Sequence, residues 1–203
     1  MQFKLEGQLI KEHPEFEMEK RLLLDKINIE KGTVCVEETE YPLKDVSFPT
    51  IDWEDPYRLS EDEADVMERL VTAFVNCEKL QRHVRFLYTQ GSLYKVYNGN
   101  LLYHGCVPLN EDGTFTRVNV FGKEYAGKEL YDVLEGYARK GYYAIDPKEK
   151  KKGQDILWFI WENQNSPVFG KAKMTTFERY FIADKKTHQA VSYTHLTLPT
   201  IRL

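Results

Sequence analysis

The sequence has little of three things: cysteine, long apolar runs and an excess of one charge. Its three cysteines, Cys35, Cys77 and Cys106, form no C-x-x-C pair, which argues against a disulfide framework and a zinc ribbon. The longest apolar stretch, Ile156 to Trp161, is far shorter than the ~20 residues that cross a bilayer. The start, MQFKLEGQLIKEHPEF, lacks the apolar run of a signal peptide. We therefore expect a cytoplasmic chain with reduced thiols and no membrane contact.

Acidic and basic residues are nearly balanced. The 203 residues include 28 Lys and Arg and 32 Asp and Glu, interspersed along the chain, for a formal net charge of -4. Such a balance gives no general attraction to nucleic acid or to anionic membrane, so neither is expected as a partner. A phosphate-bearing ligand would need a local basic site. With 42% hydrophobic residues the chain has enough apolar side chains for a core and should be globular.

The first third of the chain predicts both helix and strand. Pro14-Glu15, followed by the apolar residues of 22–27, favours a short amphipathic helix. Residues 33–37 and 41–43, separated by an acidic turn, predict a pair of strands. A proline-punctuated loop then runs from Phe48 to Pro56.

A long helix is predicted over residues 60–90. Ser60-Glu-Asp-Glu63 has the spacing of a capping box, and apolar residues recur after it at helical intervals. An unbroken helix would be about 45 Å long at ~1.5 Å per residue, so a break near Asn76 to Lys79 is an alternative. Gly91 is the expected stop.

The stretch around His104 is the first candidate site. Asn98-Gly99 is the pair preferred by two-residue hairpins, and it predicts strands over residues 92–97 and 100–105. The second strand is apolar on both faces, which favours burial inside a layered sheet. Two readings of His104 remain open: a hydrogen-bonded core histidine, or a ligand or catalytic group presented beside Gly105.

Further elements are expected after this hairpin. Residues 115–125 around Gly122 predict a second hairpin, and a helix with one apolar face should follow over residues 130–138. The charged run 146–153 is expected to be a solvated loop. Ile156 to Trp161 is a buried helix turn or strand, with its two tryptophans in the core.

The second candidate site is a group of basic residues, Lys171, Lys173 and Arg179. The two lysines precede Thr175-Thr-Phe-Glu178, which has the spacing of another capping box. Ammonium groups and free N–H groups at a helix start are suited to binding a phosphate. The alternative is a purely structural role in capping and ion pairing.

The order of several segments resembles the class III fructose-1,6-bisphosphatases, which are calcineurin-type metallophosphoesterases. The resemblance covers residues 2–189. It is carried by Phe3-Lys-Leu-Glu-Gly7, Arg21-Leu-Leu-Leu-Asp-Lys-Ile27, Asp55-Pro56, the strand–histidine–glycine run Asn98-Gly-Asn-Leu-Leu-Tyr-His-Gly-Cys-Val-Pro-Leu-Asn-Glu-Asp-Gly113, and the most specific segment, Phe169-Gly-Lys-Ala-Lys-Met-Thr-Thr-Phe-Glu-Arg-Tyr-Phe181. It implies an α/β fold, with part of a metallophosphoesterase-like sheet and flanking helices.

The same resemblance implies an activity and a cofactor. Enzymes of this family hydrolyse fructose 1,6-bisphosphate to fructose 6-phosphate in gluconeogenesis, with two divalent ions, typically manganese, held by Asp, His and Asn. His104 would be a metal ligand. The family's other ligand motifs, Asp-x-His-Gly, Gly-Asp-x-x-Asp-Arg-Gly, Gly-Asn-His-[Asp/Glu] and a later Gly-His, are missing from this sequence. The chain therefore resembles an internal segment that should be inactive alone.

The C-terminal residues and the other histidines are not expected to supply ligands. Residues 190–203 depart from the family and resemble a translated adaptor or vector read-through, so His195 is not expected to be a ligand. Neither His13, His83 nor His188 has partners at ligand spacing. A different class of function also stays open: a non-catalytic interaction module whose working surface is the 60–90 helix and in which His104 is a core residue.

Overall fold

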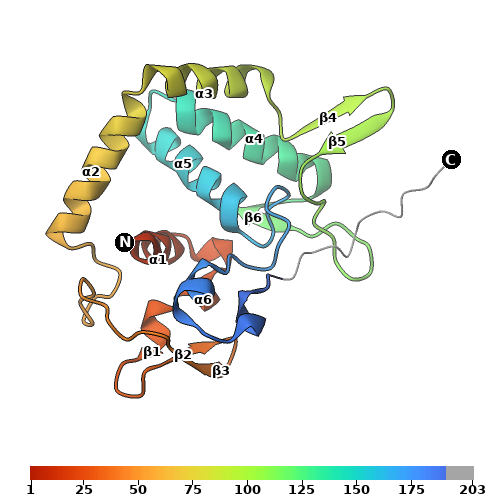
Figure 1. Ribbon diagram of the computed structural model, residues 1–203. Coiled ribbons are helices and arrows are strands. Elements are labelled where there is room, and N and C mark those ends of the chain that lie inside the picture. Colours follow the sequence, from red (N-terminus) through yellow and green to blue (C-terminus); the bar gives the residue numbers. More distant parts are fainter. Residues whose placement is uncertain (191–203) are drawn as a thin grey trace. The chain divides into compact units, whose positions relative to one another are not determined.

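The computed structural model describes residues 1–190, which form two units (Figure 1). Of the described residues, the first unit comprises 1–90 and 175–189, and the second comprises 91–174 and 190. Both mix helices with small antiparallel sheets, so the expected α/β class is confirmed at this level. No helix in residues 1–190 is long and apolar enough to span a membrane.

The first unit begins with helix α1, Gln2–Glu12. The helix predicted after Pro14 is wrong: residues 14–26 form three short 3-10 turns, Pro14–Phe16, Glu19–Arg21 and Leu24–Lys26. The local reason is Glu17, whose positive φ of 56° ends the first turn and prevents a helix from continuing. The leucines that suggested a helix instead place Leu23 and Leu24 in the core.

A three-stranded antiparallel sheet follows, with strands β1 (Ile27–Asn28), β2 (Thr33–Val36) and β3 (Thr39–Pro42) in sequential order. The predicted strand pair is therefore confirmed, with Val34 opposite Tyr41. The buried face of β2 carries Val34 and Val36, which pack into a core completed by Leu23, Leu24, Tyr57, Phe177 and Ile182.

The long helix is broken, as the alternative reading expected. Helix α2 spans Glu61–Val75 and α3 spans Glu78–Gln90, directly before Gly91. The capping box is confirmed: the Glu63 amide donates to Ser60 Oγ at 3.3 Å, and the Ser60 amide donates to Glu63 Oε2 at 2.9 Å. Glu63 also accepts from Lys4 Nζ at 2.7 Å, an ion pair in which the lysine is almost fully buried.

The C-terminal part of the first unit consists of α6 (Thr176–Phe181) and the 3-10 turn Lys185–His188. The capping box predicted at the start of α6 is wrong. Thr175 Oγ1 donates to the His188 carbonyl oxygen at 3.0 Å, and Glu178 forms a fully buried ion pair with Arg21 at 2.6 Å. Both side chains are occupied by tertiary partners instead of by the helix start.

The second unit is built on two packed helices, α4 (Gly127–Tyr143) and α5 (Pro147–Glu162), which lie side by side in Figure 1. They touch at two glycines, since a Cβ added at Gly153 would lie 2.1 Å from the backbone nitrogen of Gly141. The apolar face predicted for α4 is confirmed, with Leu130 and Leu134 fully buried.

The solvated loop predicted over residues 146–153 is wrong, because this run is the first half of α5. Asp146 caps the helix by accepting from the Glu149 amide at 2.9 Å, and Pro147 occupies the first turn, where a missing N–H costs nothing. The apolar stretch that follows is therefore helical, with Ile156 and Phe159 buried. Trp161, expected in the core, is 62% exposed.

Two hairpins complete the second unit. The first pairs β4 (Tyr94–Tyr97) with β5 (Asn100–Tyr103), and the second pairs β6 (Val118–Val120) with β7 (Lys123–Tyr125). Both were predicted, but the expected burial of the β5 strand is wrong: all four of its residues are exposed. No third strand pairs with this hairpin within residues 1–190, so its apolar residues face solvent on both sides.

Candidate functional site

His104 lies directly after the β4–β5 hairpin. Its turn residues Asn98 and Gly99 have φ values of 48° and 74°, the positive angles that a type I′ turn requires. Tyr97 pairs with Asn100 and Tyr94 pairs with Tyr103, so His104 is the first residue after the ladder. Its side chain is exposed. Of the two readings left open by the sequence, the core histidine is wrong, and His104 is accessible to a ligand.

Gly105 sets the position of His104. Its φ is +89°, and a Cβ at this position would lie 2.4 Å from the Pro167 carbonyl oxygen and 2.6 Å from that of Val168. Only glycine permits both the backbone angle and this close approach. The next residue, Cys106, donates its amide to the Pro167 oxygen at 2.9 Å. The turn that carries His104 is thereby attached to the segment 166–170.

Segment 166–170 is itself held rigidly by Ser166, which is fully buried. Ser166 Oγ donates to the Ile160 carbonyl oxygen at 2.6 Å, and it accepts from the amides of Val168 and Phe169 at 3.2 Å each. The same serine's carbonyl oxygen accepts from the Gly170 amide at 3.3 Å. The end of α5 therefore supports the turn after β5 through one buried hydroxyl group.

Cys106 has a structural environment. Its carbonyl oxygen accepts from Tyr131 Oη at 2.8 Å, and its Sγ lies 3.8 Å from the Ser166 carbonyl oxygen. Burial raises the pKa of the Cys106 thiol above its ordinary value. Burial likewise raises the pKa of Tyr131. Because the thiolate is the nucleophilic and metal-binding form, Cys106 is poorly suited to either role near neutral pH.

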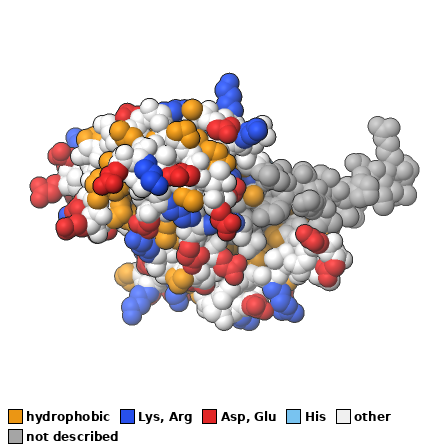
Figure 2. Space-filling view, turned by 90° about the horizontal axis from the view of Figure 1, so that it is seen from below, with side chains coloured by type: hydrophobic (Ala, Val, Ile, Leu, Met, Phe, Trp, Pro, Cys, Tyr) orange, Lys and Arg blue, Asp and Glu red, His pale blue; other side chains and the backbone are white. Residues whose placement is uncertain are grey.

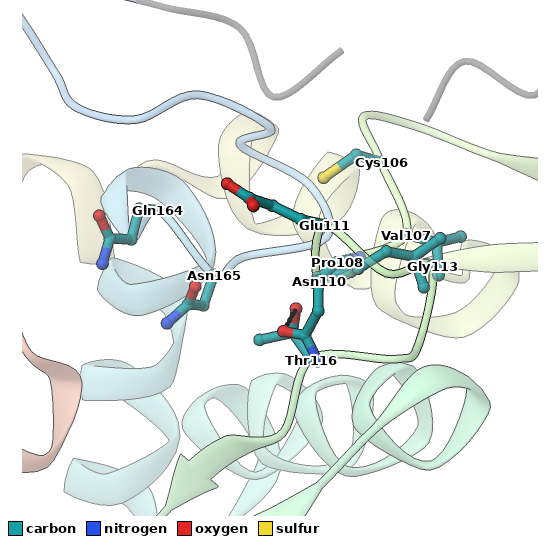
Figure 3. A pocket seen from close by; sticks show the side chains of 10 residues that line it. Cys106, Val107, Pro108, Asn110, Glu111, Gly113, Thr116, Gln164 and Asn165 are labelled. Atoms are coloured by element: carbon teal, nitrogen blue, oxygen red, sulfur yellow. Dashed lines mark hydrogen bonds between the residues drawn. The ribbon is translucent and has the colours of Figure 1, made fainter. Parts of the chain in front are cut away.

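A cavity of about 790 Å³ opens directly beside this turn (Figure 3). Most of its wall comes from the chain that follows Gly105, and Gln164 and Asn165 come from the end of α5. The described lining includes one carboxylate, Glu111, and no Lys or Arg; its residues are Cys106, Val107, Pro108, Leu109, Asn110, Glu111, Gly113, Thr116, Gln164 and Asn165. Amide and hydroxyl groups of this kind suit a neutral, hydroxyl-rich ligand better than a phosphate.

The rim of the cavity is ordered by local hydrogen bonds. Asn110 Nδ2 donates to Thr114 Oγ1 at 2.9 Å, and Thr116 Oγ1 donates to Asn110 Oδ1 at 3.1 Å. Asp112 accepts from both the amide and the hydroxyl group of Thr114. These bonds hold the pKa of Asp112 below its ordinary value. The sequence did not identify this loop as a site, although it lies within the strand–histidine–glycine run.

The predicted phosphate-binding residues lie in both units. Lys171 is exposed and Lys173 is half-buried in the second unit, whereas Arg179 is exposed on α6 in the first. The carbonyl oxygen of Arg179 accepts from Lys44 Nζ at 2.8 Å. Since the capping box is absent and α6 is a short helix, the helix start adds no support to a phosphate site. The grouping of the three residues stays a prediction.

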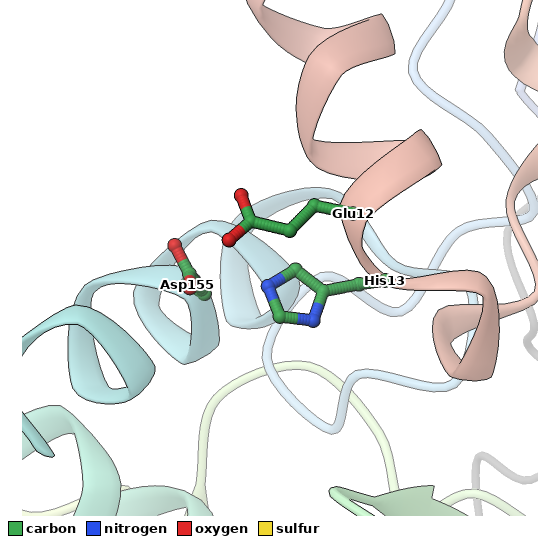
Figure 4. A group of neighbouring side chains, drawn as sticks. All are labelled: Glu12, His13 and Asp155. Carbon is green, nitrogen blue, oxygen red and sulfur yellow. The ribbon is translucent and has the colours of Figure 1, made fainter. Parts of the chain in front are cut away.

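Figure 4 draws two carboxylates and one imidazole that the sequence did not group together, Glu12, Asp155 and His13. Glu12 and His13 belong to the first unit and Asp155 to the second, so we assign no site to them. His13 Nδ1 lies 3.0 Å from Glu15 Oε1, and Asp155 accepts from Lys151 Nζ at 2.7 Å within α5. Each of these two groups thus has a structural partner in its own unit.

The two other described histidines, His83 and His188, have different environments. His83 is exposed on α3, and His188 Nε2 lies 2.8 Å from the Ile182 carbonyl oxygen. His195 and the predicted tail lie outside the described residues. All three cysteines are free thiols.

Comparison with known proteins identifies the family. The model of the Firmicute fructose-1,6-bisphosphatase family matches residues 1–198. The class 3 fructose-1,6-bisphosphatase of Clostridium tetani is 53% identical over 198 residues, which are 97% of this chain and 30% of the relative. Similar proteins of the same description from Clostridium botulinum (strain Langeland) and Clostridium novyi are 56% and 54% identical, with 93% of this chain and 28% of each relative covered.

No solved structure matches the chain. The chain spans about 30% of the length of these curated relatives. The family match extends past residue 189, and the foreign origin of residues 190–203 stays a prediction. The match includes both the His104 turn and the Lys171–Arg179 segment. The chain belongs to the Firmicute fructose-1,6-bisphosphatase family.

Proposed function

We propose that the longer protein to which this chain corresponds is a fructose-1,6-bisphosphatase. It would hydrolyse fructose 1,6-bisphosphate to fructose 6-phosphate and phosphate, a step of gluconeogenesis, in the cytoplasm. The observation that carries the proposal is the match to class 3 fructose-1,6-bisphosphatases at 53–56% identity over almost the whole chain. Because the chain spans about 30% of those relatives, the activity belongs to the longer protein.

His104 is proposed as one ligand of a two-manganese centre. Bound divalent ions would supply a hydroxide near neutral pH and neutralise charge on the transferred phosphoryl group. The chain by itself does not fit such a centre: within residues 1–190, no group of three or more His, Cys, Asp or Glu side chains close enough to hold an ion includes His104. No step through the ions is therefore assigned to this chain.

The chain's own residues would position the His104 imidazole and bind parts of the substrate. Gly105 and the Pro167 oxygen orient the turn that presents the His104 imidazole. The amide and hydroxyl groups of the adjacent cavity would accept and donate hydrogen bonds to a sugar. Lys171, Lys173 and Arg179 are proposed to bind a phosphate group of the substrate.

The exposed hairpin supports the view that a larger sheet is completed by the rest of the protein. Tyr97 is 63% exposed, and Leu101 and Leu102 on opposite faces of β5 are 52% and 53% exposed. Strands with apolar residues on both faces are normally buried on both faces. We propose that β4 and β5 join a metallophosphoesterase-like sheet whose other strands come from outside this chain.

A manganese titration tests the proposal. The isolated chain should bind manganese weakly at most, and His104→Ala should remove that binding. A longer chain with the family's flanking segments should bind two ions per molecule and release phosphate from fructose 1,6-bisphosphate, with His104→Ala reducing both. A longer chain that binds no manganese and releases no phosphate would contradict the assignment.

The second candidate function is a non-catalytic interaction module that uses α2 and α3. The observation in its favour is that neither helix has a buried residue, although both carry large apolar side chains. This function needs neither a metal nor His104. It predicts association of the isolated chain, which the phosphatase proposal does not require.

A further inference from the structure

Helices α2 and α3 expose an apolar surface that the rest of residues 1–190 does not bury. The residues of this surface, which we call the α2–α3 surface, are between 37% and 69% exposed. They are Val66, Leu70, Val71, Phe74, Val75, Phe86 and Leu87. Isolated exposed apolar residues are common, but seven of them on two successive helices indicate a binding surface. Both helices belong to the first unit.

The two helices do not cover one another. They separate at Asn76, whose amide donates to the Thr72 carbonyl oxygen, and they diverge in Figure 1. Their lengths are similar: 15 residues in α2 and 13 in α3, or about 22 and 20 Å at ~1.5 Å per residue. Each helix is therefore long enough to be covered by one copy of the other.

The charges of the two helices are opposite at the same spacing. In α2, three acidic residues recur every third position, Asp62, Asp65 and Glu68; in α3, three basic residues recur at the same interval, Lys79, Arg82 and Arg85. The apolar positions repeat as well. In each helix, apolar residues occupy the same positions relative to the three charged residues. These apolar residues are Met67, Leu70 and Val71 in α2, and Val84, Leu87 and Tyr88 in α3.

Charge and apolar pattern thus make α2 complementary to α3. We infer that the α2–α3 surface binds a second copy of this chain, with α2 of each copy against α3 of the other. A two-fold interface must be self-complementary, and this surface meets the requirement because each copy contributes one acidic and one basic amphipathic helix. The inference goes beyond the proposed phosphatase function and is independent of metal, substrate and His104.

The flanking charges are free to take part. Asp62, Glu68, Lys79 and Arg85 form no ion pair with another side chain within residues 1–190, and all four are exposed. On an ideal helix, Asp62 and Glu68 lie on either side of the apolar stripe of α2, and Lys79 and Arg85 do the same in α3. Charges at the edge of an apolar interface select the partner more than they add affinity.

Sedimentation equilibrium of the 203-residue chain tests the inference. The wild-type chain should form dimers in a concentration-dependent manner. The acid-reversed variant, Asp62→Lys with Glu68→Lys, should raise the dissociation constant about tenfold, because exposed opposite charges contribute roughly 0.2–1 kcal/mol per pair and like charges oppose binding. The base-reversed variant, Lys79→Glu with Arg85→Glu, should do the same.

Mixing the two variants gives the decisive measurement. An acid-reversed copy carries basic residues at the flanking positions of both helices, and a base-reversed copy carries acidic residues at all four positions. Opposite charges therefore face each other again in the mixture, which should form heterodimers about as tightly as the wild-type chain. Glu30→Lys with Glu54→Lys, at exposed positions outside both helices, is the control and should leave dimerisation unchanged. Circular dichroism should show that all variants remain folded.

Two results would overturn the inference. One is a wild-type chain that stays monomeric at all concentrations, which would point to the rest of the longer protein as the cover of this surface. The other is association that neither charge reversal weakens and that mixing does not restore. Neither result bears on the phosphatase proposal, whose readouts are manganese binding and phosphate release.

Discussion

The backbone of Gly105 lies against the carbonyl oxygen of Pro167, at a distance that leaves no room for a Cβ. This contact joins the turn after β5 to the segment after α5, two parts of the second unit that are about sixty residues apart in sequence. The residue before the contact is His104, and the cavity begins at the residue after it. The position of the proposed metal ligand therefore depends on how α5 ends.

Gly105→Ala should destabilise the second unit strongly. The new methyl group would meet the Pro167 and Val168 oxygens, and the φ of +89° is unfavourable for alanine, so we expect a loss of roughly 2–5 kcal/mol. Urea unfolding measures it. Gly113→Ala is the matched control, since Gly113 has a φ of +82° with no atom near its Cβ position. It should lose only about 1 kcal/mol, and equal losses would contradict the steric explanation.

Protonation of Glu63 should destabilise the first unit at acidic pH. Burial favours the protonated form of Glu63, but hydrogen bonds from Lys4, the Ser60 amide and Thr50 outweigh it and hold the pKa at about 2. A carboxyl with a depressed folded-state pKa stabilises the fold above its unfolded value of 4.5, and this stabilisation is lost as the pH falls from there toward 2.

Glu63→Gln should therefore destabilise the unit at pH 7 by roughly 2–3 kcal/mol and flatten the decline in stability between pH 5 and 2. Thermal unfolding followed across this pH range measures both effects. Glu61→Gln, an exposed residue of the same helical turn, is the control and should change little. An unchanged acid profile in Glu63→Gln would show that the Lys4–Glu63 pair contributes nothing.

Replacing one residue of the Arg21–Glu178 pair should lower the free energy of unfolding strongly, because the remaining partner is a buried charge without a counter-ion. The side chains are 7% and 0% exposed and lie 2.6 Å apart. Glu178→Leu or Arg21→Met alone should lower stability by about 3–5 kcal/mol. The double variant should lose clearly less than the sum of the two, as a double-mutant cycle in urea would measure. Additive losses would mean that the two side chains act independently.

The thiols should react at different rates. Cys77 is exposed at the start of α3, whereas burial raises the pKa of the half-buried Cys106 and reduces its thiolate fraction. At pH 8 a thiol reagent should modify Cys77 at least tenfold faster than Cys106, as peptide mass spectrometry would show. In urea the two rates should converge; equal rates in the folded chain would contradict the described burial.

In a longer, active protein, Lys173→Met should raise the apparent KM for fructose 1,6-bisphosphate by roughly tenfold or more, because one charge-assisted contact contributes about 1.5–3 kcal/mol. The turnover number should change less, because the lysine is proposed to bind a phosphate and not to take part in bond breaking. Lys185→Met, an exposed lysine of the 3-10 turn after α6, is the control. Unchanged kinetics in Lys173→Met would remove this residue from the substrate site.

The surface of the chain agrees with its balanced composition. Acidic and basic side chains are interspersed on the face shown in Figure 2. The described side chains on this face form no extended basic area. The opposite charges of α2 and α3 are a local exception, and they become apparent only when the two helices are compared position by position.

Local sequence signals determined several elements of this protein. Asn98-Gly99 specified the hairpin turn, and Ser60 with Glu63 specified the start of α2, because each depends only on residues within one turn. The spacing of apolar residues likewise located α4. The local pattern left two readings of His104 open, and the family resemblance favoured a metal ligand.

Only the tertiary structure decided what these elements contact. The apolar strand β5 is exposed because no neighbouring strand covers it within residues 1–190. Glu178 does not cap α6, because it forms a buried ion pair with Arg21 from a distant segment. The close approach of Gly105 to Pro167 could not be read from either segment alone. Turns and helix caps depend on residues that are neighbours in sequence, so the sequence alone determined them. Burial, strand pairing and ion pairing depend on residues far apart in sequence, so only the tertiary structure decided them.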